Sequence, residues 1–205
     1  EKTFDLAEQK IGAALVHLDK HAALGKTMPR STLPDGSWSL LSTDDPEERT
    51  AGFFPGCLWQ IYEARKTRLL DARKFTDYLL NARAPMKQPP PNGNLHADLG
   101  SDMTNSYLNM LLLDKTATND TTSQAVLLRA AKDLKGIYNE KAGAIIDREA
   151  GRVSAREFYV PVDYIMNLQP LFWAAKNQGS MAYREIALSH ATTTMNLHIR
   201  PDGGT

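Results

Sequence analysis

The chain has 205 residues, 42% of which are hydrophobic, and its 24 basic and 24 acidic side chains give a formal net charge of zero. This length can bury a sizeable core in one domain, and the balanced charge gives no electrostatic reason to expect nucleic acid or an anionic membrane as a partner. The single Cys57 excludes an intramolecular disulfide and a cysteine-based zinc site, which fits a cytoplasmic or a periplasmic protein.

The sequence shows no targeting segment. Its longest apolar run is far short of the ~20 residues that span a bilayer, and residues 1–20 lack the basic start and apolar middle of a signal peptide. A chain that opens on Glu1 also fits a processed protein, so secretion stays open as a third localisation.

Helices and long connections alternate in the first half of the chain. Apolar residues at three- and four-residue steps predict an amphipathic helix over residues 3–23, ended by Gly25. Turn-forming residues predict a long ordered loop over 28–48. Helices are predicted over 55–66 and 70–82, and a run of prolines then predicts an extended connection.

The second half of the chain continues this pattern. The glycine-punctuated region 141–160 predicts a loop with a short strand, and further helices are predicted over residues 101–115, 121–139, 162–177 and 180–197. Helices and loops that repeat at about 50–60 residues are typical of stacked helical hairpins, which form a solenoid or close into a ring.

An aromatic cluster lies at the entry of the predicted helix 55–66. Phe54 and Trp59 stand there beside small residues, and flat aromatic faces in such a place can stack on a sugar ring. Packing in the core is the more common role of such residues, so both interpretations stay open.

A polar segment with His96 and Asp98 precedes the predicted helix 101–115. Asp98 can hydrogen-bond sugar hydroxyls or share a proton, although an Asp ahead of a helix is most often an N-cap. The free N–H groups of a helix N-terminus also suit an anionic ligand such as a carboxylate.

A second aspartate, Asp163, enters an otherwise apolar helix in the segment VPVDYIMNLQPLFWA, with Asn167 one turn later. A carboxyl group among Val160, Val162, Ile165 and Met166 would be partly desolvated, which suits a proton donor near neutral pH. An N-cap role is equally compatible with this position.

The five histidines predict no metal site, and no cofactor motif is present. His17 and His21 are four residues apart, but no HExxH glutamate accompanies them. The sequence also lacks GxSxG, Walker and dinucleotide-binding glycine motifs. We therefore expect neither a metal ion nor a cofactor.

Four segments in this order resemble the unsaturated glucuronyl hydrolases of glycoside hydrolase family 88: RTAGFFPGCLWQIYE, LHADLGSDMTNSY, VPVDYIMNLQPLFWA and HATTTMNLHIRPDGGT. The resemblance runs from about Met28 to the last residue. It implies an all-α fold of the (α/α)6 barrel type, with residues 1–205 forming one catalytic-barrel domain and the active site at the wide end of the barrel.

The resemblance also implies roles for individual residues. Asp163 matches the general acid and base of the family, and Asp98 matches the second aspartate, which supports it and contacts the sugar. Phe54 stands where relatives often carry a stacking Trp. The residues predicted to bind the substrate are Phe54, Trp59, His96, Asn167 and Arg200.

The implied reaction removes a Δ4,5-unsaturated uronic acid from the non-reducing end of oligosaccharides that a polysaccharide lyase has made, of the glycosaminoglycan or ulvan type. The aspartate protonates C4, water adds to C5, and the resulting hemiketal opens. A rhamnogalacturonyl hydrolase acting on pectin fragments is the nearest enzymatic alternative, although the motifs GFFPG and RPDG favour the first family. A noncatalytic sugar-binding or assembly fragment and a helical repeat scaffold are alternatives of other classes.

Several features depart from the family pattern. Arg49 stands where relatives often have Trp, Ile146 lies near the position of a second aromatic, and Ser101 replaces another. The sequence ends just before the family's downstream His, so about half of the barrel is absent. We expect a truncated barrel whose apolar helix faces require the missing C-terminal half or self-association.

Overall fold

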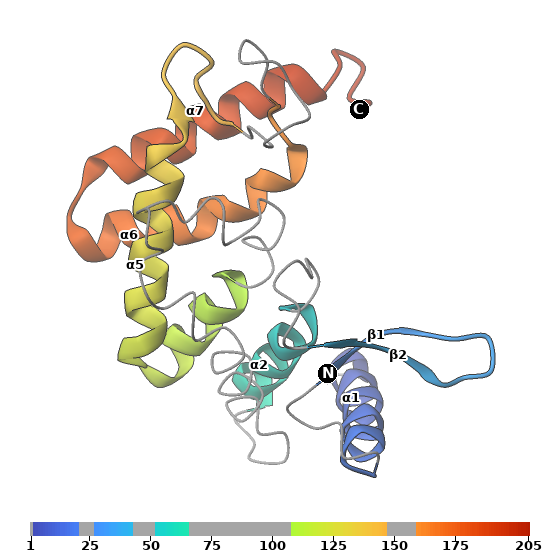
Figure 1. The fold of residues 1–205 in the computed structure, drawn as a ribbon. Coiled ribbons are helices and arrows are strands. Elements are labelled where there is room, and N and C mark those ends of the chain that lie inside the picture. The colour runs from blue at the N-terminus through green and yellow to red at the C-terminus, as the bar shows by residue number, and fades with distance from the viewer. Residues whose placement is uncertain (1, 21–26, 43–51, 66–107, 147–158) are drawn as a thin grey trace. The chain divides into compact units, whose positions relative to one another are not determined.

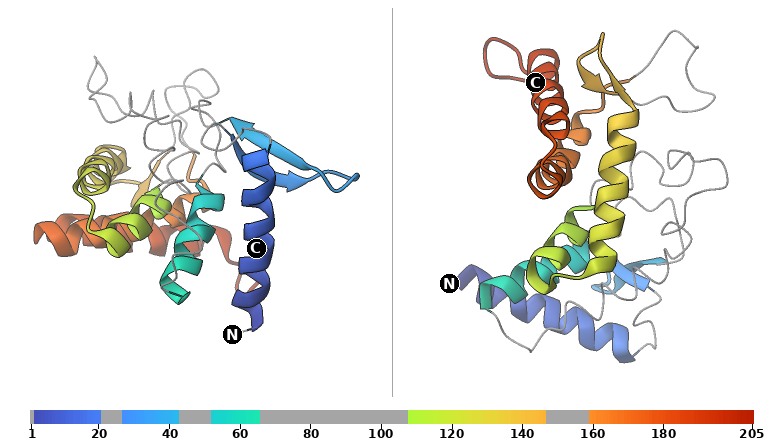
Figure 2. Two further views of the ribbon diagram at one scale, coloured as in Figure 1. Left: turned by 90° about the horizontal axis from the view of Figure 1, so that it is seen from below. Right: turned by 90° about the vertical axis from the view of Figure 1, so that its left-hand side faces the viewer.

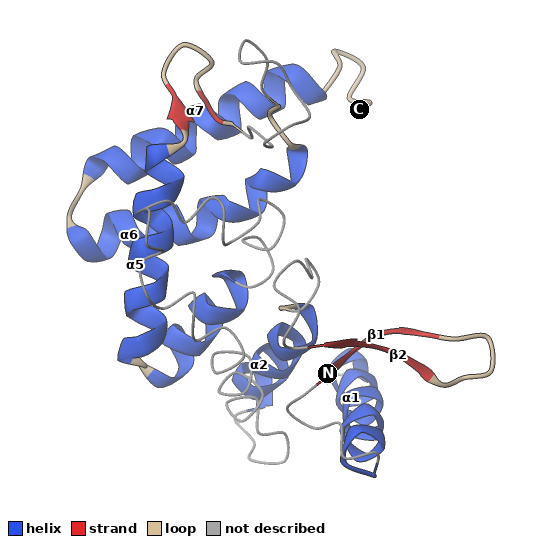
Figure 3. Cartoon of the chain, viewed as in Figure 1, coloured by secondary structure: helices blue, strands red, loops and turns tan. Residues whose placement is uncertain are grey.

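The computed structural model of the protein describes residues 2–20, 27–42, 52–65, 108–146 and 159–205. These residues fall into two compact units, Glu1–Gln124 and Ala125–Thr205, and each is described by itself. Most of the described chain is helical, as expected for an all-α protein, and the strands among the described residues form two short hairpins (Figures 1 and 3).

The first unit contains helix α1 (Lys2–Lys20), helix α2 (Phe53–Arg65) and a helical segment over residues 108–118. Ala14 and Leu18 of α1 are buried, as are Leu58 and Ile61 of α2, and the two helices pack on each other. Pro55 lies in the first turn of α2, where its missing N–H interrupts no helical hydrogen bond. The helices predicted over 3–23 and 55–66 are confirmed where the structure describes them.

A β-hairpin occupies residues 27–42, so the loop predicted over 28–48 is wrong up to residue 42, and residues 43–48 lie outside the described residues. Strand β1 (Thr27–Thr32) pairs antiparallel with β2 (Trp38–Ser42), and both views of Figure 2 show the hairpin beside α1. Its turn is closed by the hydrogen bond from Leu33 N–H to Ser37 O, 2.7 Å, with Gly36 at φ 83°.

Side-chain hydrogen bonds and a bulge explain why turn-forming residues accompany strands here. Asp35 Oδ1 accepts hydrogen bonds from the Ser37 amide at 2.9 Å and from its hydroxyl at 2.6 Å. The prolines are tolerated because Pro34 lies at the turn and the strand register shifts between Pro29 and Ser31.

Two helical segments meet at a polar corner around residues 114–123. Helix α5 (Thr121–Gly136) begins there, and Asp120 Oδ1 caps it by accepting a hydrogen bond from the Ser123 amide at 2.9 Å. The Asp114 carboxylate is buried and accepts hydrogen bonds from the hydroxyls of Ser123 and Thr118. The predicted helix over 121–139 extends too far, because α5 ends at Gly136.

The second unit contains the rest of α5, the 3-10 helix η2 (Val162–Asn167), helix α6 (Leu168–Gln178) and helix α7 (Met181–His198). Helices α6 and α7 pack side by side, joined at Gly179 with φ 62° (Figure 1). The core is apolar and is formed by Leu127, Ala131, Leu134, Leu171, Ala174, Ile186 and Ala187. The helix predicted over 180–197 is confirmed, and the one over 162–177 begins as a 3-10 turn.

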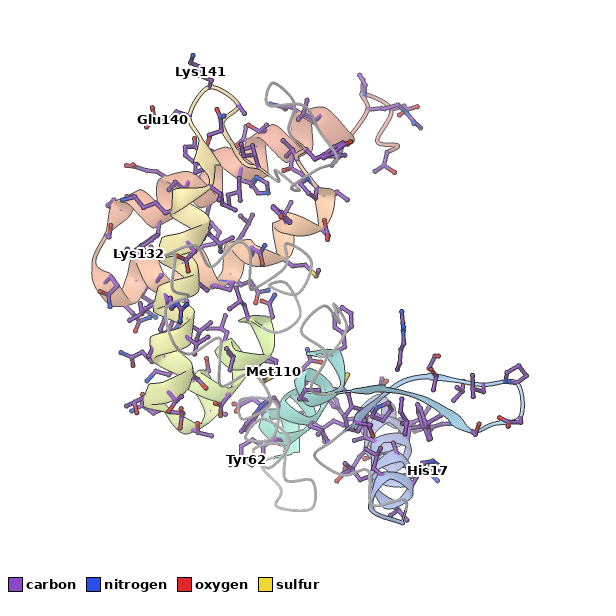
Figure 4. The ribbon with its side chains drawn as sticks, viewed as in Figure 1. His17, Tyr62, Met110, Lys132, Glu140 and Lys141 are labelled. Atoms are coloured by element: carbon purple, nitrogen blue, oxygen red, sulfur yellow. The ribbon has the colours of Figure 1, made fainter. Side chains whose placement is uncertain are left out.

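A second hairpin, β3 (Tyr138–Asn139) with β4 (Ala144–Ile145), confirms the short strand predicted within 141–160. Glu140 and Lys141 lie at its exposed tip (Figure 4). The predicted helix 70–82 and the extended connection after it lie outside the described residues. None of the helices that the structure describes is long and apolar enough to cross a membrane.

Polar side chains of α7 hold this second hairpin. The Gly143 carbonyl accepts hydrogen bonds from Ser189 Oγ and Thr193 Oγ1, both at 2.9 Å. Tyr138 Oη donates to Ser189 Oγ at 2.8 Å, and the Ile145 amide donates to His190 Nδ1 at 3.2 Å. Since His190 Nδ1 accepts, the imidazole is neutral, and burial lowers its pKa from the usual 6.5.

A comparison of Gly143→Ala with Gly179→Ala should separate the destabilisation caused by close packing from that caused by backbone strain. A Cβ atom at Gly143 would lie 3.0 Å from Thr193 Oγ1 and 3.3 Å from Ser189 Oγ, and φ is 64°. Gly179 has a similar φ of 62° but no atom within 4 Å of such a Cβ. We expect Gly143→Ala to lower the free energy of unfolding by about 2 kcal/mol or more and Gly179→Ala by about 1 kcal/mol. Urea unfolding followed by circular dichroism measures both, and equal losses would contradict the close packing of the hairpin on α7.

The buried His190 predicts a loss of stability in mild acid. The unfolded chain binds a proton at this residue as the pH falls below 6.5, whereas the native chain does so only at lower pH, so the free energy of unfolding decreases below pH 6.5. In His190→Asn, Oδ1 replaces Nδ1 as the acceptor for the Ile145 amide and does not titrate. Thermal unfolding between pH 7.5 and about 5.5 should therefore show a shallower pH dependence for the variant. Parallel curves for the two proteins would rule out a native imidazole that resists protonation.

Candidate functional site

Asp163 lies in the first turn of η2, directly after a rigid entry. Pro161 occupies the N-cap position with φ −65° and ψ 136°, and its carbonyl accepts a hydrogen bond from the Tyr164 amide at 3.2 Å. Because Pro161 takes the capping position, Asp163 is not the N-cap of this helix. Asp163 is half-buried at the start of this helix.

The 3-10 geometry of η2 sorts its residues onto three faces. With three residues per turn, side chains at i and i+3 lie in line, so the pairs are Val162 with Ile165, Asp163 with Met166, and Tyr164 with Asn167. Burial follows these pairs: Val162 and Ile165 are exposed, Asp163 and Met166 are half-buried, and Tyr164 and Asn167 are buried. Of the apolar neighbours predicted around Asp163, Val162 and Ile165 lie on a different face, as does Asn167, whereas Met166 shares the face of Asp163.

Asn167 is a buried amide with unusual surroundings. Its side chain is 1% exposed, and neither Oδ1 nor Nδ2 has a hydrogen-bond partner within the part of the chain that the structure describes. Asn167 stands at the N-cap of α6, yet its side chain makes no capping hydrogen bond. A buried polar group without a partner costs about 1–3 kcal/mol, and such groups in folded proteins call for a functional or solvent-mediated explanation.

His198 contacts the backbone that leads into η2. Its Nε2 lies 3.2 Å from Val160 O, three residues ahead of Asp163, and a carbonyl oxygen only accepts, so the ring nitrogen donates. Sequence reasoning did not assign His198 a role in the site. No sequence signal could have identified it, because the contact joins residues 38 positions apart.

The predicted aromatic site residues lie in the core of the first unit. Phe54 and Trp59 are both buried, and the ring of Trp59 makes an edge-to-face contact with Tyr62, with centroids 5.5 Å apart. In this arrangement neither ring offers an open face to a sugar. His96 and Asp98, together with Arg49 and Ser101, lie outside the described residues.

Arg200 lies in an exposed turn after α7. Its Nε is 3.4 Å from Asp202 Oδ1, and its Nη1 donates to Thr205 O at 2.7 Å. The turn is closed by the hydrogen bond from the Arg200 amide to Gly204 O, also 2.7 Å. Of the predicted site residues in the second unit, the structure therefore places Asp163 and Asn167 on one helix and Arg200 on a separate turn.

The described residues contain no group of three or more His, Cys, Asp or Glu side chains that could hold a metal ion. One carboxyl group that sequence reasoning missed is Asp133 on α5, where burial raises the pKa and Oδ2 has no hydrogen-bond partner within the described chain. The nearby Arg129 and Lys132 oppose this shift.

Comparison with known proteins identifies relatives of one kind. The chain is 31% identical over 153 residues to an unsaturated glucuronyl hydrolase of Formosa agariphila. The aligned region covers 75% of this chain and 36% of that protein. It is 29% identical over 164 residues to an unsaturated chondroitin disaccharide hydrolase of Streptococcus agalactiae, covering 77% of the chain and 38% of that protein. No family model matches the chain.

Solved structures give the same result for the fold. An unsaturated glucuronyl hydrolase specific for heparin superposes on 97% of the chain with a TM-score of 0.69 and 29% identity, and the chain covers 50% of it. The enzyme from Bacillus sp. GL1 superposes with a TM-score of 0.72 and 21% identity, again over 97% of this chain and 50% of that one. The chain thus spans about half the length of these solved structures and less than half of the curated relatives.

These similarities confirm two predictions. The resemblance to unsaturated glucuronyl hydrolases is confirmed in sequence and in fold, and the helical architecture matches about half of their α/α barrel. The comparisons do not test the roles of single residues, which therefore stay predictions.

Replacement of Asn167 by Leu tests whether its amide is unpaired in the folded chain. Since an apolar side chain of similar size removes two buried polar atoms without partners, the free energy of unfolding should stay unchanged or rise by about 1 kcal/mol. Ser123→Ala is the contrasting variant, because the buried Ser123 hydroxyl is hydrogen-bonded to Asp114, and it should lose about 1–3 kcal/mol. Urea unfolding of the parent protein and the two variants measures these changes. A decrease of ~2 kcal/mol in the free energy of unfolding of Asn167→Leu would show that the amide has a partner such as an ordered water.

Proposed function

We propose that this relative of the unsaturated glucuronyl hydrolases carries the proton-transferring aspartate of an enzyme that removes Δ4,5-unsaturated uronic acid from lyase-generated oligosaccharides. The observation that supports it most is the joint similarity in sequence and fold to enzymes of this name. The proposed enzyme is a glycoside hydrolase that hydrates the C4=C5 double bond of the unsaturated sugar. It does not displace the leaving group directly at the glycosidic carbon.

Asp163 is the residue proposed to give and take the proton. In its protonated form the carboxyl group transfers its proton to C4, and positive charge develops at C5, where the ring oxygen stabilises it. Water then forms a bond to C5 and returns a proton to the carboxylate. The hemiketal at C5 opens to a ketone, and the hemiacetal left at C1 releases the remaining sugar.

The position of Asp163 fits this role physically. Asp163 is half-buried, and the entry through Pro161 fixes the backbone that carries it. Asp98 is proposed as the second aspartate, and His96, Asn167 and Arg200 as substrate-binding residues. For Asn167 the proposal also accounts for a buried amide that has no partner among the described residues.

The proposed substrates are unsaturated oligosaccharides of the glycosaminoglycan or ulvan type. Two similar proteins, an unsaturated chondroitin disaccharide hydrolase and an unsaturated glucuronyl hydrolase specific for heparin, support the glycosaminoglycan class. An ulvan-derived oligosaccharide is the alternative within the same chemistry.

The proposed site requires further helices to be complete. Helix α7 exposes a stripe of large apolar side chains at seven-residue steps, Met181, Leu188 and Met195, which are 57%, 42% and 52% exposed. Exposed apolar stripes of this kind mark protein contacts. We propose that helices equivalent to the second half of the relatives' barrel, or a second copy of the chain, cover this face.

Replacement of Asp163 by Asn tests the proposed function. The native product that carries this sequence is first characterised by intact mass and is then assayed by the loss of ultraviolet absorbance of unsaturated chondroitin and heparin disaccharides. Asp163→Asn should lower kcat by about 100-fold or more, because general acid–base catalysis is removed, and should leave the circular dichroism spectrum unchanged. Asp5→Asn makes the same change at an exposed position of α1 and should keep full activity.

Each other outcome identifies an alternative. Retained turnover in Asp163→Asn would refute the role of this residue. Consumption of an unsaturated rhamnogalacturonan disaccharide in place of the others would identify a rhamnogalacturonyl hydrolase. Binding of the disaccharides without loss of absorbance would identify a noncatalytic sugar-binding protein.

A further inference from the structure

His198 is the last residue of α7, and its side chain reaches the backbone immediately ahead of the Asp163 turn. The half-buried imidazole donates a hydrogen bond from Nε2 to Val160 O over 3.2 Å. Helix α7 and η2 are in contact, and Figure 1 shows the chain entering η2 beside the C-terminal half of α7. The imidazole of His198 therefore connects the C-terminus of α7 by a hydrogen bond to the backbone just ahead of η2.

The backbone between Val160 and Asp163 has little freedom. Pro161 fixes its own φ at −65°, and its carbonyl is hydrogen-bonded to the Tyr164 amide at 3.2 Å. A displacement of Val160 is therefore transmitted to the first turn of η2 rather than absorbed by the intervening residues. The hydrogen bond from His198 fixes the carbonyl of Val160 at the outer end of this short rigid stretch.

Helix α7 itself is held firmly at both sides of this link. Ser189, His190 and Thr193 are hydrogen-bonded to the hairpin β3–β4, at distances of 2.9 to 3.2 Å. At its C-terminus the Ile199 amide donates to Met195 O at 3.0 Å, which continues the helical hydrogen bonding to the residue after His198. The donor to Val160 thus comes from an element whose own position is fixed.

We propose that His198 is a positioning residue for Asp163, which holds the η2 turn so that the carboxyl group meets the substrate carbon in a productive geometry. This inference rests on the proposed function of Asp163 and extends it to a residue that does not touch the substrate. Catalytic groups must be held within a fraction of an ångström, and misplacement by about 1 Å can cost about 100-fold in rate.

The essential property of His198 in this role is its hydrogen-bond donor, not its bulk. His198→Phe keeps a flat ring of similar size and removes the donor. His198→Gln places an amide nitrogen at the same number of bonds from Cβ as Nε2 and keeps the donor. Leu197→Gln is the matched control, because Leu197 is the adjacent residue of the same helix turn and is 65% exposed.

The test measures kcat and KM of these variants on the unsaturated disaccharide that the native product consumes. His198→Phe should lower kcat by about 10-fold or more with KM within about twofold, and His198→Gln should restore kcat to within about threefold of the parent. Leu197→Gln should match the parent in both constants. A purely structural role would instead lower the melting temperature of both His198 variants and leave their kcat per folded molecule unchanged.

Failure of this inference is distinguishable from failure of the proposed function. If the parent protein consumes no unsaturated disaccharide, the proposed function fails. If the parent is active and His198→Phe keeps the parent kcat, or His198→Gln is as impaired as His198→Phe, the positioning role is overturned. Amide hydrogen exchange adds a readout that needs no substrate: the Tyr164 amide should exchange faster in His198→Phe than in His198→Gln, and equal rates would also overturn the inference.

Discussion

The polar side chains along one side of α7 are the constraint on which the second unit depends. Ser189, His190 and Thr193 bind the carbonyl and amide groups of the β3–β4 hairpin, and His198 binds the carbonyl of Val160. On an α-helix these positions fall within about half of the circumference, since successive residues are rotated by about 100°. One helix face thus supplies hydrogen bonds to two stretches of backbone that could not satisfy their polar groups alone.

This face gives α7 an unusual distribution of side chains. His190 and Thr194 are fully or almost fully buried, whereas Met181, Leu188 and Met195 on the opposite side are exposed. A surface helix normally buries its apolar side and exposes its polar side. Helix α7 follows that rule at Ile186 and Ala187, which are buried, and departs from it where buried polar residues have backbone partners inside the unit and the apolar stripe is available to further helices.

The sequence predicts most of the described helices and little of what connects them. Apolar spacing places α1, α2 and α7 to within a few residues, because those helices bury side chains at three- and four-residue steps. The same reasoning misses the first hairpin, since Pro34, Asp35 and Gly36 indicate a turn equally well in a loop and between strands. It also extends α5 beyond Gly136, where an aromatic strand residue, Tyr138, continues a spacing that fits either structure.

The candidate site is less accessible to sequence reasoning, for geometric reasons. Asp163 is identified by family resemblance, whereas pattern alone leaves the N-cap interpretation open until Pro161 is seen in the capping position. Asn167 is expected on the same face as Asp163 if the helix is α-helical, but three residues per turn place it in line with Tyr164 instead. That shift moves the amide from the side of the carboxyl group into the buried interior, where a hydrogen-bonding side chain without a partner is unfavourable for stability. The 3-10 start of the helix therefore places Asp163 and Asn167 on different faces, with Asp163 half-buried and Asn167 buried. A regular α-helix through these residues would place both side chains on one face.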